Sequence, residues 1–359
     1  MVCFDPPPQS ILLIHPSLLW IYLCFACTAA GHAESRKHRD DRRQASSYKL
    51  FVFGDTFVDN GNTDKQALTW WSRNWYKPYG VSDANHDYSP TGRFSDGKVQ
   101  SDFLAMILGH DESPAPENMR RGDDDDDSFG MNFAAGFSKA KAINTTASEF
   151  SAQIGRFRRL LKHGIIGKDI SQSVALVAFS GYDYTFIPQK DTDRHGYTNF
   201  IEDVTESIAQ GVSDILELGV TKVLVNLQQP VGCAPRSTGP ANNYTGCIKN
   251  EITDIHNKKM KEKLGSDDSV LLLDLYTVFN QIIHPTSGTG FEHRHVPCCH
   301  SNEAGGYCGQ VDSWNGEELF QVCDKPDKYF YWDEWHPTQA GWSAIMDKLE
   351  DSIKKFLDI

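Results

Sequence analysis

The fold is decided by residues 50–62, which read LFVFGDTFVDNGN. Four apolar residues lead into Gly54-Asp55-Thr56, and a loop rich in Asp, Asn and Gly follows. An apolar run of this length that ends at a glycine is typical of a buried strand in a parallel sheet. Ligands of open α/β sheets bind just beyond the carboxyl ends of such strands. We therefore expect Thr56 at a binding crevice, with its backbone N–H facing that crevice.

The rest of the chain alternates between strand-like and helix-like segments. Further apolar runs predict buried strands at residues 174–179, 222–227 and 270–275. Apolar residues three or four apart predict helices at residues 99–108, 200–218, 250–264 and 339–356. Alternating β and α units indicate a parallel sheet covered by helices on both faces. Because no internal repeat or long linker indicates a second domain, we expect one α/β domain over residues 49–359.

The composition fits a globular chain that does not bind nucleic acid. With 359 residues, of which 40% are hydrophobic, the chain is long enough to bury a full core. Its net charge of −13 argues against a nucleic-acid partner, because phosphate binding needs a positive surface. A basic cluster between Arg36 and Arg43 is interleaved with Asp, and we interpret residues 31–48 as a flexible, solvated segment.

The first 30 residues have the pattern of a secretory signal peptide. Ile11 to Cys27 are mostly apolar, and small residues follow. This pattern predicts cleavage between residues 30 and 33, and hence a secreted protein. Since His15 and Pro16 interrupt the apolar run, we expect no stable membrane span. A retained signal anchor, and with it an endomembrane location, is the alternative.

Cysteine usage also points to the secretory pathway. An even number of cysteines follows the leader, which fits disulfide bonding: Cys233, Cys247, Cys298, Cys299, Cys308 and Cys323. A bond between Cys233 and Cys247 would close a local loop, while the other four cysteines allow three connectivities. Two sequons for N-glycosylation, at Asn144 and Asn243, agree with the same compartment.

A zinc site is the alternative for the cysteine-rich segment. Its candidate ligands are His293, His295, Cys298, Cys299, His300 and Cys308. Their spacing lacks a regular Cys-x-x-Cys repeat, and cysteines in an oxidising compartment pair with each other. We therefore favour disulfides, and we expect neither a metal nor an organic cofactor.

A second stretch with chemical content lies near the end of the chain, where residues 331–338 read YWDEWHPT. Asp333 precedes His336 by three residues, on a turn that Pro337 stiffens. A carboxylate in this position can bond one imidazole nitrogen and leave the other free to take a proton from a hydroxyl. Together with Thr56 beyond the first strand, the stretch predicts a nucleophile, a general base and the group that orients the base.

These stretches resemble the sequence blocks of the plant GDSL esterase/lipases, which are part of the SGNH hydrolase family. The first block of that family carries a nucleophilic serine, where this chain has Thr56, and the fifth block carries the Asp and His that complete a triad. The segments PYG at residues 78–80 and GRFSDG at residues 92–97 are similar as well. The blocks follow the family's order from about Leu50 onward. The resemblance implies a three-layer α/β/α, flavodoxin-like SGNH hydrolase fold with a parallel central sheet.

The resemblance also implies which groups would hold an oxyanion. One is the backbone N–H of Thr56. The stretch MNFAAG, which ends at Gly136, resembles the second block, whose glycine offers a backbone N–H. The stretch SGYD at residues 180–183 resembles the third block, Gly-x-Asn-Asp, with Tyr182 at the Asn position. A phenol can donate a hydrogen bond, although it reaches further than an amide.

The function implied by the resemblance is hydrolysis of a small-molecule or lipid ester by Thr56, His336 and Asp333. The methyl group of threonine restricts the nucleophile, and loss of one oxyanion donor typically costs about 10²–10³ in kcat. We therefore expect reduced activity. Two alternatives use the same cleft: acyl transfer to an alcohol other than water, and ligand binding without catalysis.

Overall fold

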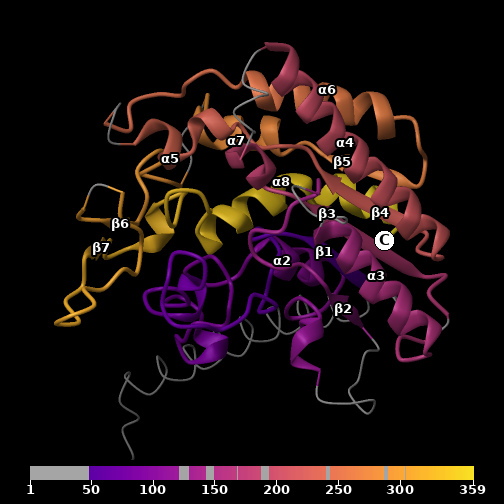
Figure 1. Cartoon of the computed structure of the whole chain (residues 1–359), viewed down its shortest axis with the longest axis horizontal. Helices are drawn as coiled ribbons and strands as arrows, with labels where there is room; N and C mark the ends of the chain where they lie inside the picture. Colours follow the sequence, from indigo (N-terminus) through magenta and orange to yellow (C-terminus); the bar gives the residue numbers. More distant parts are fainter. Residues whose placement is uncertain are drawn as a thin grey trace, which may run out of the picture. The chain divides into compact units, whose positions relative to one another are not determined.

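A five-stranded parallel sheet forms the centre of the protein (Figure 1). The computed structural model describes residues 48–120, 129–142, 149–167, 169–186, 194–239, 243–286, 290–303 and 305–359. The predicted signal peptide (1–30), residues 31–47 and Asn144 lie outside these ranges. The strands, in chain order, are β1 (Lys49–Gly54), β2 (Gly130–Asn132), β3 (Ser173–Ala178), β4 (Lys222–Asn226) and β5 (Val270–Leu273). Their order across the sheet is β2-β1-β3-β4-β5, and every neighbouring pair is parallel.

The strands are apolar along both faces because both faces are covered. In β1 every residue from Leu50 to Phe53 is fully buried. Leu50 and Val52 belong to one hydrophobic core, while Phe51 and Phe53 belong to the other, as the two-residue period of a strand requires. The sheet therefore separates two cores.

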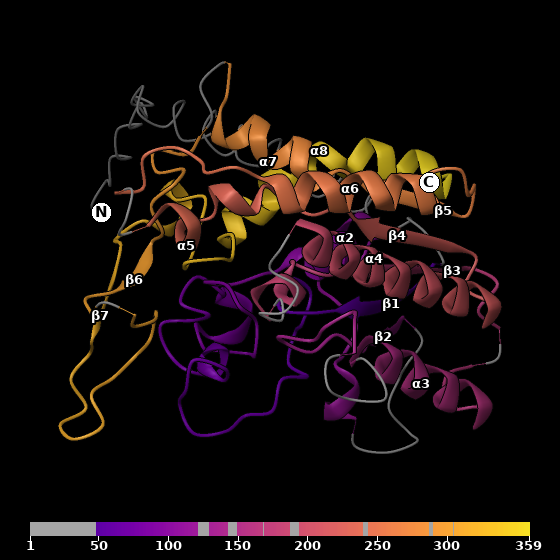
Figure 2. The same cartoon turned by 45° about the horizontal axis from the view of Figure 1, so that its top comes forward.

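Each core lies between the sheet and one layer of helices. The core with Leu50 is closed by α2 (Gln100–Ile107), α7 (Leu275–Ile283) and α8 (Gln339–Leu357). The core with Phe51 is closed by α3 (Glu149–Lys162), α4 (Arg194–Glu217) and α6 (Glu251–Leu264). Figure 2 shows the helices α7 and α8 together on their side of the sheet. The predicted three-layer α/β/α, flavodoxin-like fold is confirmed.

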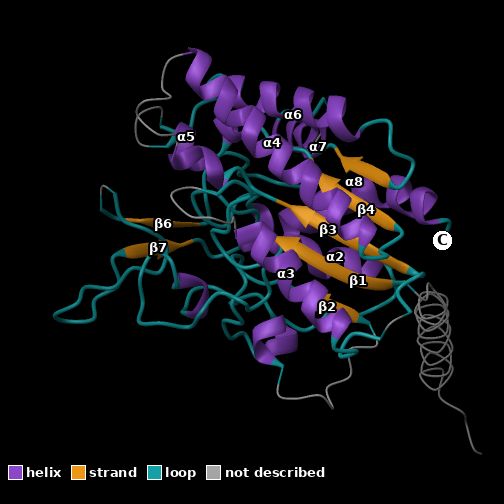
Figure 3. Cartoon of the chain, turned by 45° about the vertical axis from the view of Figure 1, so that its right-hand side comes forward, coloured by secondary structure: helices purple, strands orange, loops and turns teal. Residues whose placement is uncertain are grey.

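The carboxyl ends of the strands share one edge with a small antiparallel hairpin. Figure 3 shows the arrowheads of β1, β3 and β4 pointing toward the side on which β6 (Cys299–Ser301) and β7 (Phe320–Val322) lie. These two strands pair antiparallel. Loops that connect elements at this edge provide the walls of the site described below. Within the described ranges, every helix is too short or too polar to span a bilayer.

Candidate active site

A glycine that the fold requires ends β1. Gly54 has a φ of +144°, and a Cβ at this position would lie 1.9 Å from the carbonyl oxygen of Ala178 in β3. Only glycine adopts such a conformation without strain. The amide of Gln153 holds both backbone groups of Gly54: it accepts from the N–H at 2.9 Å and donates to the carbonyl at 2.8 Å. The chain therefore leaves the sheet at a defined angle, immediately before Thr56.

Asp55 ties the end of β1 to the end of β3. Its Oδ2 accepts hydrogen bonds from the N–H and the hydroxyl of Ser180, each at 2.7 Å. Burial raises the pKa of the Asp55 carboxyl to about 6, although these hydrogen bonds act in the opposite direction. The strand order reverses between β1 and β3, and flavodoxin-like sheets bind their ligands at this point.

Three side chains from both ends of the domain meet at this position. The hydroxyl of Thr56 lies 2.8 Å from Nε2 of His336. Nδ1 of His336 lies 2.8 and 2.9 Å from the two carboxylate oxygens of Asp333. Because a carboxylate only accepts, Nδ1 carries the proton and Nε2 accepts the hydrogen of the Thr56 hydroxyl. All three residues are buried, and the arrangement can pass a proton from a nucleophile to a base.

The turn that carries Asp333 and His336 is closed by its own hydrogen bonds. Oδ1 of Asp333 accepts from the N–H groups of Trp335 and His336 at 2.9 and 2.8 Å. The N–H of Trp332 donates to the carbonyl of His336 at 2.7 Å. Thr338 follows as the N-cap of α8 and accepts from the third residue of the helix. Backbone and side chain together thus fix the orientation of the imidazole.

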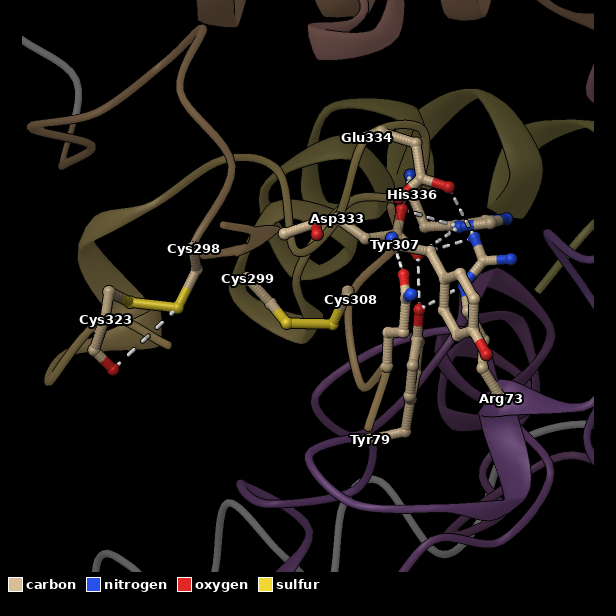
Figure 4. Close-up of a disulfide and its surroundings, with 12 residues drawn as sticks. Arg73, Tyr79, Cys298, Cys299, Tyr307, Cys308, Cys323, Asp333, Glu334 and His336 are labelled. Carbon is tan, nitrogen blue, oxygen red and sulfur yellow. Dashed lines mark hydrogen bonds and ion pairs between the residues drawn. A yellow bond between two sulfur atoms is a disulfide. The ribbon is translucent and has the colours of Figure 1, made fainter. Parts of the chain in front are cut away.

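The second oxygen of Asp333 faces a buried arginine and a buried tyrosine. Oδ2 accepts from Nη2 of Arg73 at 3.2 Å and from the hydroxyl of Tyr79 at 2.8 Å (Figure 4). Burial alone would raise the pKa of Asp333, but the charge and hydrogen bond of His336, together with Arg73, hold it well below its ordinary value. Asp333 therefore remains ionised against the imidazole.

A cavity of about 340 Å³ opens onto Thr56 and His336. Aromatic side chains dominate its wall: Trp70, Trp71, Phe137, Tyr182 and Trp335. A second hollow continues from it, because the two share Trp70, Arg236, Gly305 and Glu334. A mostly apolar cavity of this size with a few polar groups is typical of a site for a small molecule.

Gly136 does not line this cavity. Its N–H donates to Oδ2 of Asp59 and to the hydroxyl of Thr63, each at 2.8 Å, and Gly136 faces a different hollow. A Cβ at Gly136 would lie 2.5 Å from that hydroxyl, so the glycine is needed for close packing. The structure thus departs from the expectation that this N–H faces the oxyanion.

The next residue, Phe137, does line the cavity with Thr56. Its φ of +62° lies in the left-handed region, which a side chain of this size rarely adopts. Among the hydrogen bonds of the described residues, neither the N–H of Phe137 nor that of Thr56 has an acceptor. Both are therefore available to a ligand.

Tyr182, which stands at the Asn position of the third block, lies on the wall of the same cavity. Its ring contacts Trp71 and Phe137 at centroid distances of 6.1 and 5.2 Å. Burial raises the pKa of the Tyr182 phenol, so the group keeps its proton and can act as a donor.

The cysteines form three disulfides: Cys233–Cys247, Cys298–Cys323 and Cys299–Cys308. The expected loop closure is present, and the open connectivity of the last four cysteines is resolved. The sulfurs that a zinc site would need are thus bonded to each other. Of the two sequons, Asn243 is described and exposed.

A known family matches this sequence over most of its length. The family of GDSL-like lipases and acylhydrolases matches residues 50–349. The chain belongs to this family. The GDSL esterase/lipase At5g03610 of Arabidopsis thaliana is 32% identical over 94% of this chain and 98% of its own length. At5g03600 from the same plant is 31% identical over 86% and 95%.

Among solved structures, the acetylxylan esterase Axe2 of Geobacillus stearothermophilus covers 88% of this chain and 97% of its own, with a TM-score of 0.37 and 11% identity. Membership of the GDSL family supports a hydrolase function for the chain.

The GDSL site also contains groups that no sequence pattern singled out. Arg73 is fully buried against Asp333, although it begins a short 3-10 helix (Arg73–Trp75) in a segment without a recognisable motif. Ser180 belongs to the third block, but its partner Asp55 becomes evident only when β1 and β3 lie side by side. The positive φ of Phe137 could not be predicted from the sequence, because a positive φ is usually predicted from a glycine.

Proposed function

We propose that this GDSL chain hydrolyses carboxylic esters with Thr56 as the nucleophile. The observation that carries the proposal is the pair of short contacts from the Thr56 hydroxyl to Nε2 of His336, 2.8 Å, and from Nδ1 of His336 to Asp333, 2.8 Å. These contacts match the roles of nucleophile, base and orienting carboxylate.

The reaction proceeds in two halves. Oγ1 of Thr56 attacks the ester carbonyl carbon while Nε2 of His336 takes the hydroxyl proton. The ester C–O bond then breaks, and the imidazolium gives this proton to the leaving alcohol. In the second half, water loses a proton to Nε2 and attacks the threonyl ester, which releases the acid and restores the hydroxyl of Thr56. Asp333 stays ionised throughout and stabilises the imidazolium.

Three donors would hold the oxyanion. The backbone N–H groups of Thr56 and Phe137 are two, because each belongs to a residue on the cavity wall and lacks a partner among the described residues. The phenol of Tyr182 is the third. Gly136, whose N–H already has two acceptors, is replaced in this role by its neighbour. Donors of this kind act where charge develops and contribute several kcal/mol to the lowering of the barrier.

The substrate is an acyl or lipid ester whose apolar part lies against the aromatic wall. The cavity volume of about 340 Å³ suits a short or medium acyl group, and the adjoining hollow offers room for the other side of the ester. The chain acts after secretion, with glycosylation at the exposed Asn243 and at Asn144. This location is supported by the leader-like segment and by the disulfides.

Threonine makes the enzyme slower than its serine counterpart would be. Its hydroxyl is chemically competent, but the extra methyl group restricts χ1 and crowds the path of attack in a buried position.

The test is turnover of p-nitrophenyl butyrate by the purified chain and by Thr56→Val, which keeps the shape of the side chain but removes the hydroxyl. We expect turnover by the wild type and loss of at least about a thousandfold in the variant. Thr221→Val is the matched control, because the Thr221 hydroxyl bonds the carbonyl of Ser173 at the opposite end of the sheet. Equal rates for the wild type and Thr56→Val would refute the proposal.

Ligand binding without turnover is the second candidate, and the methyl group of Thr56 together with the phenol of Tyr182 favours it. A binding protein would show no turnover above that of His336→Ala, yet would retain a bound acyl ester. Acyl transfer uses the same groups, and it would appear as a butyryl ester of an added alcohol.

A further inference from the structure

We propose that Arg73 is a positioning residue of the catalytic site, which, together with Tyr79, holds the carboxylate of Asp333 in the orientation that serves His336. The inference rests on the proposed ester hydrolysis. It adds a third part of the chain, the aromatic loop around residues 70–80, to the two blocks that contribute Thr56 and His336.

Arg73 has an unusual environment for a cation, because its side chain is fully buried. Every nitrogen of its guanidinium nevertheless has an acceptor. Nη2 donates to Asp333 at 3.2 Å and to Glu334 at 2.8 Å, Nη1 donates to the carbonyl of Trp70 at 2.6 Å, and Nε donates to the hydroxyl of Tyr79 at 2.6 Å. Figure 4 shows this guanidinium directed toward the two carboxylates.

Aromatic rings lie close to the guanidinium. Its central carbon lies 4.6 Å from the ring centroid of Trp70 and 5.4 Å from that of Phe94. Burial opposes the charge, but Glu334 and Asp333 outweigh it and raise the pKa of Arg73, which stays cationic. A buried charge is costly unless it is paired, and pairing with the carboxylate that bonds Nδ1 of His336 indicates a role beyond packing.

The two oxygens of Asp333 share the imidazole but differ in their other partners. Oδ1 lies 2.8 Å from Nδ1 of His336 and also accepts from the backbone of the turn. Oδ2 lies 2.9 Å from the same Nδ1 and also accepts from Arg73 and from the hydroxyl of Tyr79. Tyr79 also accepts from Nε of Arg73, so the arginine orients the tyrosine that donates to Asp333. Without Arg73, Oδ2 would retain only the imidazole and a tyrosine hydroxyl that Arg73 no longer orients. The carboxylate could then turn away from Nδ1.

Arg73 also changes the electrostatic environment of the imidazole. Charged and titratable groups surround His336 on several elements. Asp333 and Glu334 belong to its own turn, and Asp55 lies at the end of β1. Arg73 and Tyr79 contact Asp333, while Tyr182 and Arg236 line the same cavity as His336. A nearby cation repels the positive charge of an imidazolium, and Arg73→Gln removes this repulsion. The acid limb of the pH–rate profile should then move to higher pH, by about one pH unit.

The experiment compares Arg73→Gln with Arg73→Lys on p-nitrophenyl butyrate, with kcat and kcat/KM measured from pH 4 to 9. We expect Arg73→Gln to lower kcat by up to about a hundredfold and to shift the acid limb of kcat/KM upward. Arg73→Lys should lower kcat, because it loses the fork of donors, but it should leave the limb near its wild-type position. Arg93→Gln is the control, since Arg93 is a second buried arginine, paired with Asp102 away from the cavity.

The result that overturns the inference is an unshifted limb and an unchanged kcat in Arg73→Gln, or the same changes in Arg93→Gln. If Arg73→Gln does not fold, Arg73→Lys and Tyr79→Phe replace it in the test. Both variants should lower kcat and leave the acid limb at its wild-type pH. A wild-type kcat in both variants refutes the inference. Failure of the proposed function is distinguishable, because the wild type would then show no turnover that depends on His336. An NMR titration of the His336 ring, identified by its loss in His336→Gln, measures the same shift in Arg73→Gln without any substrate.

Discussion

The Thr56 hydroxyl meets Nε2 of His336 at 2.8 Å, although 280 positions of sequence separate the two residues. The contact exists because β1 ends, and α8 begins, at the edge of the sheet where the strand order reverses.

Thr56→Ser should accelerate the enzyme. Serine keeps the hydroxyl within reach of His336 and removes the methyl group that restricts χ1, so we expect kcat to rise at least about tenfold. Steady-state kinetics on p-nitrophenyl butyrate measure this directly. A lower kcat in Thr56→Ser would mean that the methyl group positions the hydroxyl and does not obstruct it.

Tyr182→Phe should lower kcat with little effect on KM. The phenol is buried on the cavity wall, and the loss of one oxyanion donor typically costs about 10²–10³ in kcat. Tyr182→Asn should exceed Tyr182→Phe in kcat, because the amide restores a donor. If Tyr182→Phe matches the wild type, the phenol is a wall residue only.

His256 should make the folded protein less stable in acid. Burial lowers the pKa of His256 to about 3, while the hydroxyl of Tyr184 lies 2.5 Å from its Nδ1. In the unfolded chain His256 therefore binds a proton as the pH falls through about 6.5, whereas in the folded chain it stays neutral until the pH nears 3. The contribution of neutral His256 to the free energy of unfolding is present above pH 6.5 and falls by about 1.4 kcal/mol per pH unit toward pH 3.

Urea unfolding of the wild type and His256→Gln at pH 7, 6, 5 and 4 measures this contribution. The difference in the free energy of unfolding should change steadily below pH 6.5, in favour of the variant. His163→Gln, at an exposed position, is the matched control. A constant difference across this range would contradict the prediction.

The disulfide Cys299–Cys308 should stabilise the segment that leads to Asp333. The N–H groups of Cys298 and Cys299 donate to the carbonyls of Tyr331 and Trp332 at 3.0 and 2.7 Å, just before the aspartate. A loop of this separation contributes about 2–3 kcal/mol. The double variant Cys299→Ala, Cys308→Ala should lose this amount in urea unfolding, and a non-reducing peptide map that shows other pairs would refute the assignment.

Much of the sheet could be predicted from the sequence because its strands are buried on both faces. Runs such as Leu50–Phe53 and Val174–Phe179 are apolar throughout, and this pattern distinguishes them from loops. The strand β2 has three residues, Gly130–Asn132, and lacks an apolar run, so no pattern predicted it. The helices α3 and α7 and the hairpin of β6 and β7 were not predicted either.

The candidate site, too, could be predicted from the sequence only in part. The turn from Asp333 to His336 is local, so three residues of spacing were enough to predict its hydrogen bond. The burial of Arg73 depends on carboxylates about 260 positions away, which no local pattern encodes. Gly136 was expected at the oxyanion because the stretch that ends there resembles the second block of the family. Its N–H donates to Asp59 instead, and the neighbouring Phe137 lines the cavity.

The most direct test of the central claim is covalent trapping with a fluorophosphonate, followed by mass spectrometry of the labelled peptide. We predict one phosphonyl group on the hydroxyl of Thr56, absent from Thr56→Val and from His336→Ala. Label on another residue such as Ser180, in a protein that hydrolyses p-nitrophenyl butyrate at the wild-type rate, would contradict the account.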